Sequence, residues 1–521
     1  MSKEMGLTPF RNEPYLDWSD EGNVGKLRAA LEKVGGELGG SYPLIIGGKP
    51  VETEGEIVSE NPAKPSQVVG RVGRATEREA GMALDAATRA FEFWRNTPPE
   101  ARSRILLRAA AVMRRRRFEM IAWEIYEGGK PWAEADAQIA EAIDFLEYYA
   151  REMLRLKDGK PVAPFPGEEN RYFYQPLGVG VIIAPWNFPT AILTGMSSAA
   201  IVTGNTIVMK PSEYTSVIGA KVAEIFEEAG LPAGVLNFCA GYGSEIGDYL
   251  VEDARTRFIS FTGSMKTGLR INERAARTAP GQRWIKRVLA EMGGKDAIVV
   301  DETADLEAAA EGIAVSAYGY AGQKCSACSR AILQEDIHDE VLGRILERAK
   351  ALRVGPPGSP EVFVGPLISR PQFEKVAGYI EVGKEEAERV LGEDPGDPEE
   401  GYFVSPTVFA GADPRSRIAQ EEIFGPVLTV LKARDFDEAL RIANDSPYGL
   451  TGGVYSRDRE RLERARHEFR AGNLYFNRKI TGALVGVQPF GGFDLSGTNA
   501  KAGGPDYLTL HMQAKSVAER F

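Results

Sequence analysis

The sequence has 521 residues, of which 43% are hydrophobic, 26% charged and 9% aromatic. These proportions are those of a folded globular protein, and they exclude disordered, collagen-like and disulfide-scaffold classes. The 63 basic and 74 acidic residues give a formal net charge of −11, which argues against a broad surface for nucleic acid or anionic membranes. The length allows two or three domains.

The first predicted elements are helices. Apolar residues recur at helical spacing from Glu77 to about Leu156, with breaks at residues 97–99 and 128–131. This pattern predicts three long helices in series. The four arginines Arg114–Arg117 lie inside it, and we expect them to form a solvated helix face.

The stretch from Tyr172 to Met209 carries no charged residue and is long enough to resemble a membrane span. Prolines, glycines and asparagines interrupt it, and a continuous helix does not tolerate them. We therefore predict buried parallel strands joined by tight turns and a short helix, and no membrane span.

From about Gly178 short β-rich runs alternate with helical patterns, which predicts parallel βαβ units and two α/β domains in tandem. The first series has predicted strands at residues 179–184, 206–209, 235–238 and 258–261, and a helix at 217–229. The second has predicted strands at residues 297–300, 427–431 and 453–455, and helices at 306–320 and 338–352. Gly392–Gly401 is expected to be a surface loop.

Two glycine-containing segments are candidates for binding a dinucleotide. Gly241–Gly247 comes close to the G-x-G-x-x-G pattern, but its last glycine is one residue late. In Phe258–Gly268 a strand, a turn of small residues with Gly263 and Ser264, and a helix follow one another. The helix N-terminus and the Ser264 hydroxyl would suit a diphosphate, and a plain tight βα turn is the alternative.

Lys210 and Glu213 directly follow the predicted strand at residues 206–209. They would lie at the carboxyl edge of a parallel sheet, where open α/β folds bind ligands. A base and an acid at this place suit a ribose and its hydroxyls, although an ordinary surface ion pair is the other interpretation.

The chain has three cysteines and three histidines, which limits its chemistry. His338, His467 and His511 show no metal-ligand spacing, so we expect no metal site and no Ser-His-Asp triad. Residues 1–15 mix acids, bases and prolines without an apolar run. We therefore expect no signal peptide and a cytoplasmic location.

The most specific local signal is Gly322–Arg330, which contains Cys325 and Cys328. Their spacing is compatible with redox chemistry or half a zinc site, but zinc needs two further ligands, and Cys239 lies far away in the sequence. We favour a lone nucleophilic thiol. Glu291 is the candidate base, because a carboxylate can activate water for thioester hydrolysis.

The order and spacing of six motifs, from about Tyr42 to Tyr507, resemble those of the aldehyde dehydrogenase superfamily. The motifs are Pro185–Pro189, Lys210–Glu213, Phe261–Ser264, Glu291–Lys295, Gly322–Cys325 and Glu421–Pro426. The resemblance implies two parallel-sheet α/β domains, one a Rossmann-like cofactor domain and one catalytic, plus a small β oligomerisation flap. It implies an NAD-binding domain at residues 1–156 and 175–290, a catalytic domain at 291–488, and a bridging or oligomerisation segment at 157–174 and 489–521.

Within the superfamily, residues 322–327, 477–492 and 9–14 resemble the dehydrogenases of Δ1-pyrroline-5-carboxylate, also called L-glutamate γ-semialdehyde dehydrogenases. Two departures are Cys328, where relatives often carry a small residue without a thiol, and Met292, where leucine or threonine is commoner. The resemblance implies NAD-dependent oxidation of L-glutamate γ-semialdehyde to L-glutamate through a cysteine thioester, the second step of proline catabolism. Another acid-bearing aldehyde, such as succinate semialdehyde, is the alternative substrate, and a catalytically silent protein on this fold is a rival from another class.

The resemblance also assigns catalytic roles. Cys325 would attack the aldehyde, Glu291 would activate water, and the Asn187 amide with the Cys325 backbone N–H would bind the oxyanion. It assigns NAD binding to Trp186, Lys210, Glu213, Gly263, Ser264, Glu422 and Phe424. The carboxylate of Glu213 would accept the ribose hydroxyls and repel a 2′-phosphate, so NAD⁺ is expected over NADP⁺.

For the substrate, the resemblance assigns Glu141, Phe188, Ser326, Gly482, Ala483 and Phe490. Backbone N–H groups at Gly482 and Ala483, with the Ser326 hydroxyl, would anchor the α-carboxylate. The two phenylalanines would pack against the aliphatic middle of the substrate. Glu141 would approach the α-ammonium group, or would simply be a solvent-facing charge on its helix.

The resemblance implies a homo-oligomer built from dimers. The projecting sheet for this contact would be formed by Gln513–Phe521 and the segment around Asp158–Tyr174. It leaves open whether dimers assemble into hexamers and whether the chain associates with a proline dehydrogenase. The first 40 residues are too few to carry such an enzyme as a barrel domain.

Overall fold

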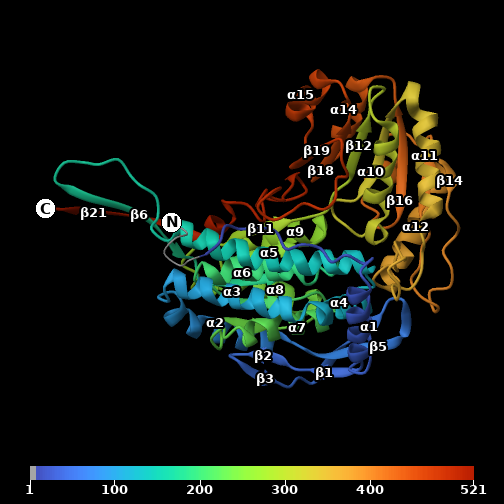
Figure 1. The fold of residues 1–521 in the computed structure, drawn as a ribbon. Coiled ribbons are helices and arrows are strands. Elements are labelled where there is room, and N and C mark those ends of the chain that lie inside the picture. The colour runs from blue at the N-terminus through green and yellow to red at the C-terminus, as the bar shows by residue number, and fades with distance from the viewer. Residues whose placement is uncertain (1–6) are drawn as a thin grey trace.

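The structure, a computed structural model, describes residues 7–521, so the first six residues of the predicted N-terminal domain lie outside the described residues. Two seven-stranded sheets lie in two neighbouring α/β bodies, and a thin two-stranded arm projects from one of them (Figure 1). The predicted fold class, with two mainly parallel sheets, is confirmed.

The first sheet has the strand order β11-β10-β7-β8-β9-β2-β3. Its parallel strands are β7 (Val179–Ile183), β8 (Thr206–Lys210), β9 (Leu236–Phe238), β10 (Thr256–Thr262) and β11 (Arg287–Glu291). The short strands β2 (Leu44–Ile46) and β3 (Lys49–Val51) add an antiparallel edge. Four of these parallel strands are at the places where the sequence predicts them.

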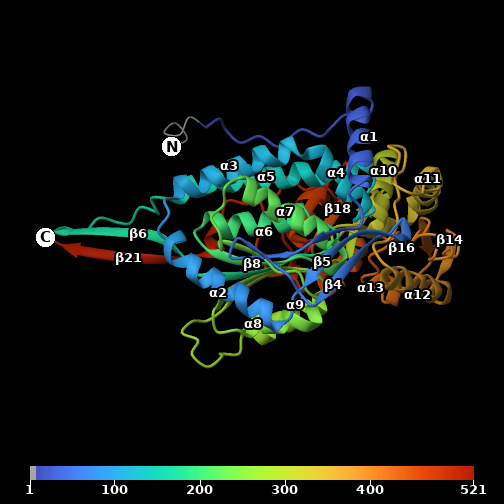
Figure 2. The ribbon, with the colours of Figure 1, turned by 90° about the horizontal axis from the view of Figure 1, so that it is seen from below.

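Helices cover both faces of the first sheet (Figure 2). On one face lie α3 (Pro99–Arg115), α5 (Trp132–Leu156), α6 (Ala191–Val202) and α7 (Ser216–Glu228), and on the other lie α2 (Glu77–Trp94), α8 (Asp248–Glu252) and α9 (Met265–Ala275). Helix α6 is almost entirely buried, because α5 packs over it. Among residues 7–521 no helix is long and apolar enough to cross a membrane.

The three predicted helices between Glu77 and Leu156 are four in the structure. Arg116, with φ −93° and ψ 11°, ends α3, and α4 (Arg117–Tyr126) begins directly after it. The prediction that Arg114–Arg117 form a solvated face holds for Arg114 and Arg115, whose side chains are 39% and 60% exposed, but is wrong for Arg116 and Arg117. The Arg117 side chain is only 8% exposed and pairs with Asp136 at 2.6 Å, because α5 places a buried carboxylate opposite it.

The second sheet has the order β14-β15-β16-β13-β12-β18-β19, with only β14 antiparallel to its neighbour. Its strands are β12 (Asp296–Val300), β13 (Cys328–Gln334), β14 (Glu388–Leu391), β15 (Thr407–Ala410), β16 (Val427–Ala433), β18 (Thr451–Tyr455) and β19 (Asn473–Phe476). Its helices are α10 (Leu306–Tyr318), α11 (His338–Ala351), α12 (Arg370–Glu386), α13 (Arg417–Gln420), α14 (Phe436–Asn444) and α15 (Arg459–Glu468). Residues 392–401 contain no helix or strand, as predicted.

The chain passes from the first sheet to the second between Glu291 and Asp296. Glu291 ends β11, whereas Cys325 lies just before β13 of the second sheet. The candidate base and the candidate nucleophile therefore come from different sheets. Short connecting elements are η2 (Glu213–Thr215), η3 (Gly243–Gly247), η4 (Gly319–Gly322), η5 (Glu335–Ile337), η6 (Tyr507–His511), β17 (Tyr448–Gly449) and β20 (Phe493–Asp494).

The N-terminal region has elements that the sequence analysis did not predict. They are α1 (Glu21–Gly35) and a three-stranded sheet of β1 (Gly40–Tyr42), β5 (Lys64–Arg74) and β4 (Gly55–Asn61). This sheet lies beside the body of the first sheet, below it in Figure 1.

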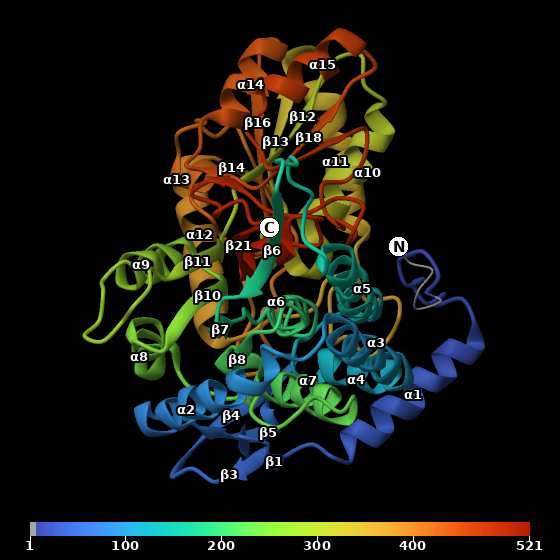
Figure 3. The same cartoon turned by 90° about the vertical axis from the view of Figure 1, so that its left-hand side faces the viewer.

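The projecting arm consists of β6 (Glu168–Pro176) and β21 (Met512–Arg520), which pair antiparallel along their whole length. It extends away from the body, with the C-terminus at its tip, and points toward the viewer in Figure 3. All of β21 after Met512 is exposed. Residues 489–511, which the sequence analysis groups with this bridging or oligomerisation segment, precede the arm and contact the end of β11.

Candidate functional site

The loop before β13 holds Cys325 in a fixed, half-buried position. Tyr320 and Ala321 have φ of 51° and 53°, so the chain turns sharply after α10. The buried Gln323 side chain braces the loop, because its Oε1 accepts from the Ile368 N–H at 2.9 Å and its Nε2 donates to the Pro366 carbonyl at 3.1 Å. Burial, and then the nearby carboxyl groups of Asp296, Glu422 and Glu291, raise the pKa of the Cys325 thiol.

Asn187 lies in the loop after β7 and reaches the nucleophile loop. Its side-chain amide donates one hydrogen bond to the backbone carbonyl of Gln323 at 3.0 Å. An amide group has two N–H donors, so the second remains for another acceptor. The side chain is buried and lines the same cavity as Cys325. Its bond to Gln323, two residues before Cys325 in the sequence, holds the amide beside the nucleophile loop, which suits an oxyanion donor.

Glu291 ends β11 and is held by backbone N–H groups. The carboxylate accepts from Gly492 at 3.2 Å and from Ala500 at 3.2 Å. Burial nevertheless raises the pKa of Glu291 to about 8, and these two hydrogen bonds and Lys501 oppose that shift. A carboxyl group with such a pKa can take up and release a proton near neutral pH.

Cys325 and Glu291 line the same cavity. All six residues that the sequence analysis assigns to the substrate also line it, namely Glu141, Phe188, Ser326, Gly482, Ala483 and Phe490. The sequence analysis assigned no substrate role to its other lining residues, which are Phe145, Ile192, Gly195, Met196, Thr262, Met292, Ala502 and Tyr507. The lining is largely apolar, with acidic and small polar groups at particular places.

Glu141 is on α5 and faces this cavity rather than solvent. Burial, and then Asp144, raise its pKa to about 7, whereas Lys130 and Lys324 lower it. The structure therefore places a carboxyl group in the lining of the cavity, which contradicts the solvent-facing alternative.

A second cavity meets the first at Thr262, Met292 and Cys325. Five of the residues predicted to bind a cofactor line it, namely Trp186, Gly263, Ser264, Glu422 and Phe424. The rings of Trp186 and Phe424 meet edge to face at 5.3 Å, and the Glu422 carboxylate is oriented by the Gly294 N–H at 3.0 Å. Ser264 caps the N-terminus of α9, where backbone N–H groups attract anions.

The model of the aldehyde dehydrogenase family matches residues 50–517. The chain belongs to the aldehyde dehydrogenase family. A relative named 1-pyrroline-5-carboxylate dehydrogenase, from Geobacillus thermodenitrificans, is 60% identical over 515 residues, which are 99% of this chain and 100% of the relative.

Two solved structures are also similar to this aldehyde dehydrogenase. One is a 1-pyrroline-5-carboxylate dehydrogenase from Thermus with bound NAD, with a TM-score of 0.98 and 58% identity, covering 99% of this chain and 100% of that chain. The other is proline utilization A (PutA) from Bdellovibrio bacteriovorus, with a TM-score of 0.96 and 42% identity. It covers 98% of this chain but 53% of that one.

Lys210 and Glu213 of this aldehyde dehydrogenase do not line either cavity. Lys210 ends β8 next to the end of β7, is buried, and donates to the Pro211 carbonyl at 3.2 Å. Burial lowers the pKa of Lys210, and Glu213 at the start of η2 opposes that shift. The two residues therefore lie at the carboxyl edge of the sheet, as predicted, one strand away from Trp186.

Sequence reasoning missed two lysines and one glutamine around the two cavities of the aldehyde dehydrogenase. Lys375 and Gln372 line the second cavity. Lys130 is fully buried, with its ammonium 4.2 Å from the Phe188 ring centroid and 4.3 Å from that of Tyr320. The sequence shows Lys130 only as part of a helix break. Among residues 7–521 no group of three or more His, Cys, Asp or Glu side chains is arranged to hold a metal ion.

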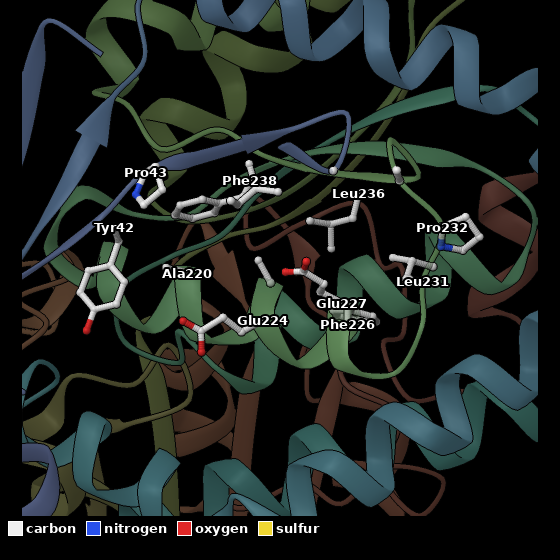
Figure 4. A pocket seen from close by; sticks show the side chains of 14 residues that line it. Tyr42, Pro43, Ala220, Glu224, Phe226, Glu227, Leu231, Pro232, Leu236 and Phe238 are labelled. Atoms are coloured by element: carbon white, nitrogen blue, oxygen red, sulfur yellow. The ribbon is translucent and has the colours of Figure 1, made fainter. Parts of the chain in front are cut away.

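Another hollow of the aldehyde dehydrogenase, shown in Figure 4, lies between α7 and the strand β2. Tyr42, Leu236 and Phe238 form part of its apolar lining, and Glu224 and Glu227 are its carboxylates. It shares no residue with the two cavities at Cys325, so it is not part of the candidate active site.

Proposed function

We propose that this aldehyde dehydrogenase oxidises L-glutamate γ-semialdehyde, in equilibrium with Δ1-pyrroline-5-carboxylate, to L-glutamate with NAD⁺, the second step of proline catabolism. The observation that carries the proposal is that the six substrate residues line the same cavity as Cys325 and Glu291. The names of the relatives at 60% and 58% identity agree with it.

The second cavity fits NAD⁺, because it combines a helix N-terminus, two aromatic rings and a fixed carboxylate. We assign Gly263 and Ser264 to the diphosphate, and Glu422, Phe424 and Trp186 to the nicotinamide end. Lys210 and Glu213 are assigned to the adenosine ribose. When bound, the cofactor accepts the hydride that leaves the substrate.

The chain's own residues carry the remaining chemistry. The Cys325 thiol gives its proton to solvent, and its sulfur bonds to the aldehyde carbon as the carbonyl π bond breaks and its electron pair moves to the oxygen. The oxygen that becomes negative accepts hydrogen bonds from the Asn187 amide and the Cys325 backbone N–H. Removal of one such donor typically costs ~3–4 kcal/mol of transition-state stabilisation. After the hydride has left, the acyl group is a thioester on the sulfur.

Glu291 then takes a proton from water, whose oxygen attacks the acyl carbon, and the C–S bond breaks to release the carboxylic acid. The base must be ionised for this step. Because burial raises the pKa of Glu291 to about 8, hydrolysis is expected to speed up as the pH rises toward that value.

Substrate selection follows from the far end of the cavity. Gly482, with φ of 75°, and Ala483 form a turn whose N–H groups we assign, with the Ser326 hydroxyl, to the α-carboxylate. Glu141 is assigned to the α-ammonium group. Succinate semialdehyde has a carboxylate but no ammonium group, so it would leave Glu141 unpaired.

The test compares the rate of NADH formation from L-glutamate γ-semialdehyde and from succinate semialdehyde. A higher kcat/KM is expected for the amino-acid aldehyde, and Glu141→Gln is expected to narrow the difference. Cys325→Ala is expected to abolish turnover of both, which excludes a silent protein with a contaminating activity. A clear preference of the wild-type enzyme for succinate semialdehyde would refute the proposal.

We further propose the domain division at residues 1–156 with 175–290, 291–488, and 157–174 with 489–521. The change of sheet after Glu291 supports the first boundary. The exposed arm supports a dimer that forms through this segment, and assembly of dimers into hexamers is the next stage to test.

Two wider assignments complete the proposal. The likeness to PutA supports association with a proline dehydrogenase, which would supply the substrate. The free thiols of Cys239, Cys325 and Cys328 support a cytoplasmic location, because reducing conditions keep such thiols unpaired.

A further inference from the structure

Residues 489–502, which we call the base loop, fold around the end of β11. The backbone N–H of Met292 donates to the Ser496 carbonyl at 2.8 Å, and that of Thr498 donates to the Ala290 carbonyl at 2.8 Å. The same loop supplies both N–H groups that hold the Glu291 carboxylate. The position of the candidate base therefore depends on the shape of this loop.

The Lys501 side chain stabilises the base loop through hydrogen bonds. Its ammonium group donates to the carbonyls of Gly472 at 2.5 Å and Gly491 at 2.8 Å, and to Asn473 Oδ1 at 3.3 Å. These three acceptors match the three N–H donors of a lysine side chain. The backbone of Lys501 has φ of 50°, which an L-residue adopts only where its surroundings hold it.

Gly491 lies between Lys501 and the Glu291 carboxylate. A Cβ atom on Gly491 would lie 2.8 Å from the Lys501 backbone nitrogen and 3.1 Å from Glu291 Oε1. The Asn473 side chain secures the same stretch, since it accepts from the Gly491 N–H at 3.1 Å and donates to the Pro489 carbonyl at 3.0 Å. A movement of the Lys501 ammonium would thus displace the groups that grip Glu291.

We propose that Lys501 is a positioning residue for Glu291, because its ammonium group fastens the loop that grips the carboxylate and keeps a positive charge beside it. The inference rests on the part of the proposed function in which Glu291 activates the hydrolytic water. A nearby cation favours the ionised form of a carboxyl group. Lys501 thereby opposes the effect of burial, and it keeps more of the base in its active form at neutral pH.

The titratable groups that act on or respond to Glu291 are Lys501, Tyr507 of η6 and Cys325. Tyr507 is buried and its pKa is raised, so it stays neutral in the working range. Cys325 is acylated during the hydrolytic step, so it does not titrate in that step. In a plot of the hydrolysis rate against pH, the acid limb is the part where the rate rises with pH. A shift of this limb therefore reports on Glu291 and Lys501.

The experiment measures hydrolysis of 4-nitrophenyl acetate against pH in the full chain. This activated ester acylates a nucleophilic thiol without the aldehyde or the cofactor. The acyl-enzyme is formed at high pH, freed of excess ester and shifted to each test pH, and its decay, followed by intact-protein mass spectrometry, measures the hydrolytic step alone. The variants are K501Q, which keeps N–H donors without charge, K501M, which removes both, and K501R, which keeps the charge. K350Q on the exposed face of α11 is the matched control.

For K501Q we expect the acid limb to move up by about one pH unit, and the rate at pH 7 to fall about tenfold. K501R and K350Q should keep the wild-type limb. Circular dichroism and thermal unfolding show which variants fold. If K501M does not fold, the pH profile of K501Q tests the inference. A folded K501Q with the wild-type limb, or an equal shift in K501R, would overturn the inference.

The same preparations separate this inference from the proposed function. If K501Q shifts ester hydrolysis while the wild-type enzyme fails to oxidise L-glutamate γ-semialdehyde, the substrate assignment is wrong and the role of Lys501 stands. If the wild-type enzyme oxidises the semialdehyde and K501Q leaves the limb unmoved, the role of Lys501 alone is refuted.

Discussion

Cys325 lies among groups that oppose its ionisation. Burial has the largest effect, and the carboxyl groups of Asp296, Glu422 and Glu291 add to it. Because the thiolate is the attacking species, the thiol of the free enzyme is a weak nucleophile at neutral pH. Because oxidants attack the thiolate, the raised pKa of Cys325 also slows oxidation of its sulfur in the free enzyme.

The resulting prediction concerns alkylation of the free enzyme by iodoacetamide. The rate at Cys325 is expected to rise about tenfold per pH unit between pH 7 and 9, because the thiolate fraction grows in that proportion below the pKa. Peptide mass spectrometry of timed samples measures it. Cys239 and Cys328 serve as internal controls and should stay unlabelled, since both are buried. A rate at Cys325 that levels off below pH 8 would contradict the prediction.

The sequence was sufficient to find residues that motifs carry, such as Cys325, Asn187 and Glu291, and the structure brings these three together. It was not sufficient for Lys130 and Lys501. A lysine in a sequence is most often a solvated charge, and only three-dimensional neighbours show that the acceptors of Lys501 come from residues 472, 473 and 491.

At the scale of elements, the arginines between α3 and α4 tie several helices together. The Arg117 guanidinium donates to Asp136 on α5 and to the Pro14 carbonyl at 2.9 Å. Asp136 in turn accepts from the Leu16 N–H at 2.8 Å. One buried ion pair therefore fixes the N-terminal segment against two helices.

Arg117→Met is expected to lower the free energy of unfolding by ~3–5 kcal/mol, because it leaves the Asp136 charge buried without its partner. The matched control is Arg115→Met, whose side chain is 60% exposed and pairs with Glu228 at the surface. It should change stability by less than ~1 kcal/mol. Urea unfolding followed by tryptophan fluorescence measures both, and equal losses in the two variants would refute the argument.

Regular alternation of strands and helices made β7, β8, β9 and β10 predictable, because each is a short apolar run followed by a helix or turn. The sheet of β1, β5 and β4 was not predictable in the same way. Its first strand has only three residues, and it pairs with residues 70–72. The break at Arg116 was also not predictable, since arginine is a good helix former.

At the scale of the whole molecule, the arm projects away from the body (Figure 1). Nine residue pairs join β6 to β21, and Val517 and Phe521 leave apolar surface exposed at 38% and 81%. An isolated two-stranded ribbon is marginally stable in water. A second chain that packs on it would supply the missing support.

We expect the double variant Val517→Asp with Phe521→Asp to be monomeric at micromolar concentrations at which the wild-type enzyme is a dimer or larger. Charges on the exposed surface of the arm oppose its burial against another chain. Size-exclusion chromatography with light scattering measures the mass. Met82→Asp, at an exposed position on α2, is the control and should keep the wild-type mass. A wild-type enzyme that is itself monomeric would remove the basis of the prediction.

The passage of the chain from one sheet to the other between Glu291 and Asp296 has a consequence for how the enzyme responds to motion. Base and sulfur are carried by separate rigid frames, so catalysis depends on how accurately those frames are aligned. A misplacement of about 1 Å can cost about a hundredfold in rate. The turnover rate therefore depends strongly on the relative orientation of the two sheets. A substitution far from both residues can slow the enzyme by changing that orientation.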